Sequence, residues 1–279
     1  MKLCDILVHV DASPQARIRL DLAVALARQH QTHLTALHII DVALPVMAMG
    51  DGGGGGAVIA ELMEQMRQTA LTAGAQLKTI FQEAIRREGV MGEWRQVEGR
   101  AVELLALHGR YADLLVMGQD DPESGNAGLL EAVLFDSGRP VLAIPFAGTY
   151  KTIGKRVLVG WNASREASRA VHDALPLLAK AESTCVFLAN PKRGLAAHGE
   201  EPGADIARHL ARHGLKVEVA KTIADDVADS ALLLNHASDM SADLLVMGAY
   251  GHSRLREFIL GGVTRSLLRE MTVPVLLSH

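Results

Sequence analysis

Aromatic residues and clustered positive charge are both scarce in this sequence. Phe, Trp and Tyr together make up 4% of the 279 residues, and the formal net charge is −4. Proteins that bind duplex nucleic acid neutralise its phosphates with grouped Lys and Arg, and single strands are held by stacking on aromatic rings. We therefore expect no nucleic-acid partner.

Long apolar runs and targeting features are missing as well. No apolar run approaches the roughly 18 residues that a membrane-spanning helix needs. The chain passes from Met1 directly into a strand pattern without the features of a signal peptide. These absences predict a soluble, cytoplasmic protein with no membrane span.

Residues that form disulfides or hold metals are few and scattered. Cys4 and Cys185 lie in separate strand-like segments without a CxxC motif, so we interpret both as reduced thiols in the core. His30 and His33 stand at the end of a helical pattern without grouped partners, which favours a solvated surface. The sequence therefore predicts no metal site.

The residues that are present favour a duplicated α/β protein. Hydrophobic residues make up 49% of the chain and charged residues 22%, which suits aliphatic parallel strands flanked by helices. The strand and turn of residues 6–13 recur at residues 157–164, and the sequence DLLVMG occurs in both halves, ending at Gly118 and Gly248. A repeat of this size indicates two domains with the same fold. The predicted domains are residues 1–149 and 150–279.

The most informative stretch follows the second DLLVMG strand. Gly248 ends that strand, and further glycines precede a helical pattern. Glycine lets the backbone turn with positive φ and lets a ligand approach the main-chain amides, while the first amides of a helix attract anions. The pattern therefore predicts a cradle for phosphate groups. Its members are Gly248, Gly251, Gly261, Gly262, Val263 and Thr264.

Together these motifs resemble the universal stress protein family, and the whole chain resembles a tandem member with two such domains. The resemblance rests on opening strands followed by DAS and NAS, the repeated DLLVMG strand, a final Pro-Val-Leu strand and the spacing G-x2-G-x9-G. It implies, in each half, a five-stranded parallel sheet with helices on both faces, of the Rossmann-like class seen in adenine nucleotide alpha hydrolases. It also implies pairing of residues 139–145 with residues 273–279, which would make the chain an intramolecular pseudo-dimer; a further homodimer is left open.

The resemblance also implies a site for ATP or a related adenine nucleotide in the second half. Gly248, Gly251 and Gly261 match the motif glycines whose loop wraps the triphosphate. Asn162 stands where the family has an aspartate near the ribose or base, and Asn190 matches a position whose backbone contacts adenine. Mg²⁺ could accompany the nucleotide, but no protein ligand for it is identified. The predicted site comprises Asn162, Asn190, Gly248, Gly251, Arg254, Gly261, Gly262 (where the family has Ser or Thr), Val263 and Thr264.

The first half departs from this pattern. After Gly118 the sequence continues Gln-Asp-Asp-Pro-Glu, with no glycine at the spacing of the motif. Carboxylates at this place would repel a polyanion by about 1 kcal/mol each even when well solvated. We therefore predict that the nucleotide site of the first half is degenerate and does not bind ATP.

The leading hypothesis is a stress-response sensor or regulator that binds the nucleotide in its second half and hydrolyses it slowly at most. The motifs GxxxxGK[ST] and GxSxG are missing, as are paired acids placed to hold Mg²⁺. No catalytic residue is therefore predicted, and a hydrolase or transferase is the least favoured reading. The alternative hypothesis is a scaffold without nucleotide, which recognises a protein partner or a small apolar ligand through the Met- and Gly-rich residues 41–57.

Overall fold

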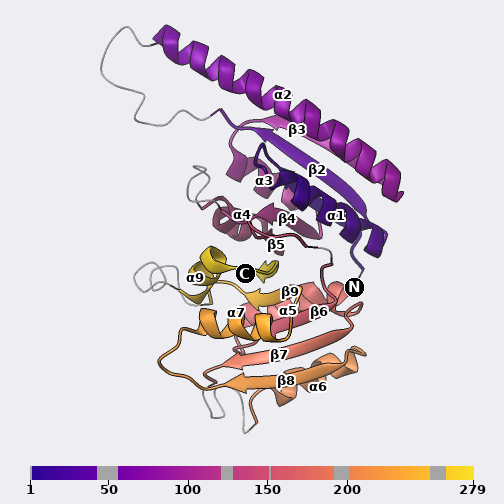
Figure 1. Ribbon diagram of the computed structural model, residues 1–279, viewed down its shortest axis with the longest axis vertical. Coiled ribbons are helices and arrows are strands. Elements are labelled where there is room, and N and C mark those ends of the chain that lie inside the picture. The colour runs from indigo at the N-terminus through magenta and orange to yellow at the C-terminus, as the bar shows by residue number, and fades with distance from the viewer. Residues whose placement is uncertain (1, 43–55, 121–127, 151, 192–200, 252–261) are drawn as a thin grey trace.

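Strands and helices alternate along the whole chain (Figure 1). The computed structural model describes residues 2–42, 56–120, 128–150, 152–191, 201–251 and 262–279. The first half contributes β1 (Asp5–Val10), α1 (Ala16–His30), β2 (His33–Ile40), α2 (Gly56–Glu88), β3 (Gly92–Glu98), α3 (Ala101–Gly109), β4 (Leu114–Gly118), α4 (Leu129–Ser137) and β5 (Val141–Ile144). The second half contributes β6 (Arg156–Gly160), α5 (Arg165–Leu178), β7 (Ser183–Ala189), α6 (Ala204–Arg212), β8 (Val217–Thr222), α7 (Asp229–Asp239), β9 (Leu244–Gly248), α9 (Val263–Glu270) and β10 (Val275–Ser278).

All ten strands form a single sheet in the order β3-β2-β1-β4-β5-β10-β9-β6-β7-β8. Neighbouring strands are parallel within each half, whereas β5 and β10 pair antiparallel at the junction, where Leu276 lies opposite Leu142. The second half thus repeats the strand order of the first. The predicted fold of two five-stranded parallel sheets is confirmed, and the last strands of the two halves pair within one chain as expected.

Apolar side chains form one core on each face of the sheet. The strands are almost continuously apolar because helices cover both faces, as the pattern of buried parallel strands predicts. One core includes side chains of α1, α2, α5 and α6, and the other includes side chains of α3, α4, α7 and α9. Both cores cross the junction, since Leu142 and Leu276 belong to the first, and Val141 and Val275 to the second.

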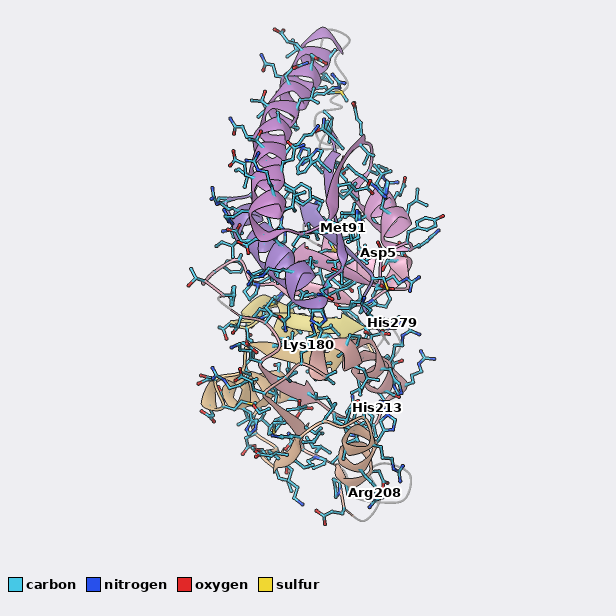
Figure 2. The ribbon with its side chains drawn as sticks, turned by 90° about the vertical axis from the view of Figure 1, so that its right-hand side faces the viewer. Asp5, Met91, Lys180, Arg208, His213 and His279 are labelled. Atoms are coloured by element: carbon cyan, nitrogen blue, oxygen red, sulfur yellow. The ribbon has the colours of Figure 1, made fainter. Side chains whose placement is uncertain are left out.

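Two expectations for single residues were wrong. Cys4 is exposed because it lies just before β1, whereas Cys185 is buried within β7 as expected. His30 is buried in the last turn of α1, and this burial, with a smaller effect of Lys180, lowers its pKa to about 4. Lys180 comes from the second half and lies near the junction of the two halves (Figure 2). Its ammonium group donates to the carbonyl of Gln29 in the first half. In the described part of the chain, no helix is long and apolar enough to cross a membrane.

Candidate functional site

The strand order places the predicted site at a switch point of the second half. β6 lies between β7 and β9 in the sheet. The chain leaving β6 continues to β7 on one side, and the chain leaving β9 continues to β10 on the opposite side. In parallel α/β sheets, ligands bind outside the carboxyl ends of the strands at this kind of position. Asn162 follows the end of β6, and Gly248 is the last residue of β9.

The contact between β9 and α5 requires glycine at position 248. A Cβ at Gly248 would lie 2.3 Å from the amide nitrogen of Ala167 and 2.4 Å from the carbonyl carbon of Glu166. These atoms are backbone, so a side chain would push the first turn of α5 away from the sheet. Ser164 caps this helix, because its Oγ accepts a hydrogen bond of 3.1 Å from the amide of Ala167. The start of α5 therefore sits directly against the end of β9.

The segment after β9 turns back toward α9. Tyr250 has a φ of 56°, and its amide donates to Thr264 Oγ1 over 3.3 Å. Thr264 is buried, so its hydroxyl holds the turn, while Val263 beside it is exposed. Gly262 is the N-cap residue of α9, and its carbonyl accepts the amide of Ser266. The hydrogen bond from Tyr250 to Thr264 thus places the residues just after Gly248 beside the start of α9.

The two asparagines of the predicted site have different surroundings. Asn162 is exposed, and its Oδ1 accepts the amide of Ser164 over 3.1 Å, which shapes the turn before α5. Asn190 has a φ of 46°, and its Oδ1 accepts the amide of Ala224 over 2.7 Å. Its Nδ2 donates to Asp229 over 2.8 Å. The side chain of Asn190 therefore holds the loop before α7 in place. Its backbone is the part that could contact a ligand, as the family resemblance implies.

Glu166 is a residue of this region that sequence reasoning missed. Its side chain is only 3% exposed, and its Oε2 would lie 3.2 Å from a Cβ on Gly251. Burial raises the pKa of this carboxyl, but hydrogen bonds from Arg165 and from its own amide outweigh that effect, so the pKa lies below its usual range. An ionised carboxylate consequently stands beside Gly251. In the sequence, Glu166 is two residues after the capping Ser164. Acidic residues are common in the first turn of a helix, so nothing in the sequence marked this one as special.

Two predicted site residues, Arg254 and Gly261, lie outside the described residues, as does most of the 41–57 segment. The described part of the cradle therefore consists of Gly248, Gly251 and the start of α9. Among the residues that the structure describes, no group of three or more His, Cys, Asp and Glu is arranged to hold a metal ion.

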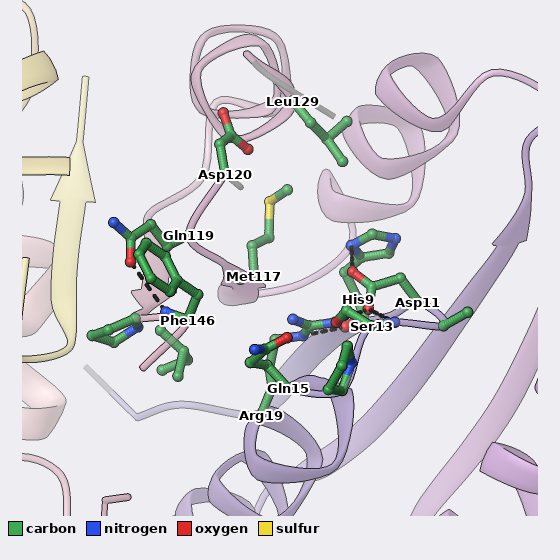
Figure 3. A pocket seen from close by; sticks show the side chains of 15 residues that line it. His9, Asp11, Ser13, Gln15, Arg19, Met117, Gln119, Asp120, Leu129 and Phe146 are labelled. Carbon is green, nitrogen blue, oxygen red and sulfur yellow. Dashed lines mark hydrogen bonds and ion pairs between the residues drawn. The ribbon is translucent and has the colours of Figure 1, made fainter. Parts of the chain in front are cut away.

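The first half has a cavity of about 320 Å³ at the corresponding place, outside the ends of β1, β4 and β5 (Figure 3). Polar and apolar side chains both line it, and His9, Asp11, Ser13 and Arg19 lie together on one side (Figure 3). The polar residues include His9, Asp11, Ser13, Gln15, Arg19, Gln119 and Asp120, and the apolar residues include Met117, Leu129, Ile144 and Phe146.

Arg19 and Asp11 form an ion pair at this cavity. Arg19 Nη2 lies 2.8 Å from Asp11 Oδ1, and Arg19 Nε donates to the carbonyl of His9 over 2.7 Å. Burial raises the pKa of Asp11, but the guanidinium of Arg19, with smaller effects of His9 and Ser13, holds it well below its usual range. Burial also lowers the pKa of His9 to about 4, so its imidazole is neutral at pH 7. Sequence reasoning missed Arg19, because a lone Arg in a helical pattern reads as a solvated face.

Arg19 also occupies space that the second half fills with backbone. A Cβ on Gly118 would lie 2.4 Å from Arg19 Nη1, whereas the same position in the second half meets the first turn of α5. Nearby, Asp120 accepts the amides of Gly128 and Leu130 at the start of α4, over 2.8 and 3.2 Å. Burial raises its pKa, although these bonds oppose the shift. Asp120 therefore adds a carboxyl group to this cavity, whereas the charge of Asp11 is balanced by that of Arg19.

The comparisons with known proteins agree with the repeated fold. The model of the Universal stress protein family matches residues 5–137 and 154–279. A universal stress protein of Synechocystis sp. is 39% identical over 67 residues, which make up 24% of this chain and 22% of that relative. A universal stress protein of Archaeoglobus fulgidus superposes with a TM-score of 0.72 at 18% identity, covering 98% of this chain and 95% of that one. A protein of Pseudomonas aeruginosa PAO1 whose function is unknown superposes with a TM-score of 0.55 at 14% identity, covering 99% of this chain and 92% of that one.

Proposed function

Because the chain belongs to the universal stress protein family and carries its domain twice, we propose that the second half binds ATP or a related adenine nucleotide. In this proposal the protein acts as a stress-response sensor or regulator, and it hydrolyses the nucleotide slowly at most. The observation that carries the proposal is the close packing of Gly248 against the first turn of α5, together with the hydrogen bond from the amide of Tyr250 to Thr264 at the start of α9.

The phosphate groups would lie between the starts of two helices. The first amides of a helix have no partner within the helix, and the helix dipole is positive there, so both starts attract an anion. Gly251 and Gly262 have no side chain that would keep a phosphate group from their own backbone amides. The backbone amides of Val263 and Thr264 at the start of α9 would contribute as well, although the Thr264 side chain is buried. Arg254 and Gly261 also belong to the site in the proposal. Mg²⁺ would enter with a triphosphate, and no protein ligand is assigned to it.

The base and ribose would lie above the ends of β6 and β7. Asn162 is exposed next to the end of β6, where its amide group can donate to the sugar or base. The backbone of Asn190 would contact the adenine, because its side chain is engaged with Ala224 and Asp229.

The first half would not bind ATP under this proposal. Its cavity contains the Asp11–Arg19 ion pair, and Asp120 lies where a phosphate loop would otherwise run. A triphosphate would have to displace or approach these groups, and the carboxylate of Asp120 would oppose it electrostatically. The domains proposed as 1–149 and 150–279 therefore differ in function although they share a fold.

Calorimetry with AMP and with ATP tests the proposal, using the wild-type protein and Gly251→Asp. We expect the wild type to bind, and the variant to bind at least about tenfold more weakly, because the added carboxylate would face the phosphates. Ala75→Asp adds the same charge on the exposed face of α2 and serves as the matched control. Failure of the wild type to bind either nucleotide, or equal binding by Gly251→Asp, would overturn the proposal. Release of phosphate from ATP, followed over hours, measures the slow hydrolysis.

A further inference from the structure

Glu166 lies at the phosphate end of the proposed site. A Cβ on Gly251 would be 3.2 Å from Glu166 Oε2 and 3.7 Å from Ser164 Oγ, so the carboxylate borders the glycine turn directly. The backbone of Glu166 packs against Gly248 in the same contact. The side chain is thus held between two of the motif glycines, and it comes from a different element, α5.

The carboxylate of Glu166 forms an ion pair with Arg165, whose side chain is open to water. Arg165 Nε donates to Glu166 Oε1, but the Arg165 side chain is 87% exposed. The carboxylate itself is 3% exposed, so its field is less screened by water than that of a surface acid. His279 lies near enough to favour the ionised carboxylate as well. Glu166 is therefore an anion at neutral pH.

The duplication supplies an internal comparison. Ser13 and Ser164 occupy equivalent places after β1 and β6, and the residue two positions later is Gln15 in the first half and Glu166 in the second. Gln15 lines the first-half cavity. The same fold position therefore carries a neutral amide in one half and a carboxylate in the half that keeps the glycines.

We propose that Glu166, placed beside Gly251, is a specificity-determining residue that disfavours triphosphates, so that the second half prefers an adenine nucleoside carrying no more than a single phosphate group. This inference rests on the proposed function of the same site. Each phosphate added beyond the first brings negative charge toward a fixed carboxylate, and like charges a few ångströms apart repel strongly where water is partly excluded. Adenosine carries no phosphate, so its binding is independent of Glu166.

The test compares adenosine, AMP and ATP by calorimetry on the wild type and on Glu166→Gln, in buffer without divalent cations. Glutamine keeps the size of the side chain and is the residue at the equivalent position of the first half. We expect ATP to bind at least about tenfold more tightly to the variant, with adenosine affinity unchanged, so that the ATP-to-adenosine ratio rises by the same factor. Glu270→Gln removes an equal charge from the exposed, distant end of α9, and should leave this ratio unchanged.

The other outcomes contradict either the role of Glu166 or the proposed function of the site. Adenosine binding with an unchanged ATP-to-adenosine ratio in Glu166→Gln overturns the role of Glu166 and leaves the proposed function standing. Weaker ATP binding by the variant when Mg²⁺ is added also overturns it, because Glu166 would then act as a metal ligand. Absence of binding by adenosine, AMP and ATP to both proteins overturns the proposed function, and the inference with it.

Discussion

Single residues decide how the two copies of the domain differ. Arg19 of α1 fills the space beside Gly118 and pairs with Asp11, whereas the second half has Ala170 at the equivalent place of α5 and brings backbone against Gly248. The end of β4 thus has the Arg19 side chain as its neighbour, whereas the end of β9 has the start of α5. The difference lies in packing as much as in charge, since the guanidinium and the helix backbone occupy the same region.

Buried histidines make a prediction about pH. Burial lowers the pKa of His30 to about 4, from an ordinary value of 6.5, so the unfolded chain takes up a proton that the folded protein does not. Stability is therefore full above about pH 6.5 and falls as the pH is lowered toward 4. We expect urea unfolding at pH 7 and pH 5 to show a loss of about 2 kcal/mol attributable to this group.

The variant His30→Leu should reduce that loss. Leucine suits the buried site and cannot be protonated, but His9 is also held neutral by burial, so part of the pH dependence will persist. The same pH dependence in wild type and variant would contradict the assignment to His30.

At the scale of single residues, the sequence indicated that Gly248 occupies a special position, but it did not indicate Glu166 or Arg19. Gly248 was identifiable because its position after an apolar strand is informative without knowledge of its neighbours. The positions of Glu166 and Arg19 could not be predicted in the same way, because each acts on residues brought near by the fold, and the sequence alone does not show which strand end a helix will touch. The exposure of Cys4 and the burial of His30 escaped prediction for the same reason.

Among the elements, α2 is the longest helix described, and in Figure 1 it extends beyond the strands that it covers. It lies close to the sheet at Gly74, where a Cβ would be 2.7 Å from His38 Cδ2 and 2.9 Å from Gln96 Oε1. His38 cannot move away easily, since its Nδ1 contacts the carbonyl of Val10 over 2.8 Å and its ring stacks on Trp94.

Gly74→Ala should therefore destabilise the protein, although alanine favours a helix by about 1 kcal/mol. We expect a net loss of about 1 kcal/mol in the free energy of unfolding, because overpacking at a fixed neighbour costs more than the helix propensity gains. Ala75→Gly at the adjacent exposed position is the matched control, and it should cost about 1 kcal/mol through propensity alone. A stabilised Gly74→Ala variant would show that α2 can shift away from β2.

The existence and type of most elements followed from apolar periodicity, because long helices and buried strands carry repeated signals. Their ends were less predictable. Asp and Ser are common helix-capping residues, and Asp11 and Ser13 both precede α1. The helix nevertheless begins at Ala16 without a side-chain cap, since Asp11 is engaged by Arg19 and by the amide of Ser13. In the second half Ser164 does cap α5.

For the whole molecule, the β5–β10 pairing joins two domains into one sheet. The strand β10 is buried along its length, and its pairing with β5 covers the edge that a separate second domain would expose. Unpaired apolar edges are prone to pair with another chain. The resemblance to the universal stress protein family implied this pairing, whereas the apolar pattern of the two last strands does not by itself specify which strands pair.

A fragment of residues 150–279 should therefore dimerise through β10. Leu276 lies at the centre of the pairing with β5, so in the fragment it would face its own copy across the new junction. Light scattering coupled to gel filtration should give a dimer for the fragment, and Leu276→Lys in the fragment should weaken it. A monomeric, folded fragment would contradict the prediction and would show that β10 needs no partner strand.

The short helix α9 contacts both halves of the chain. It begins at Gly262 in the proposed nucleotide site, and the carbonyls of Leu268 and Arg269 near its other end accept hydrogen bonds from the Gln119 side chain, over 2.7 and 3.1 Å. Gln119 also accepts the amide of Phe146, and both residues line the first-half cavity (Figure 3). The Gln119 side chain thus connects the last turn of α9 to the wall of the first-half cavity. We therefore expect a substitution that shifts α9 to alter the position of Gln119, because the helix ends on hydrogen bonds to that side chain.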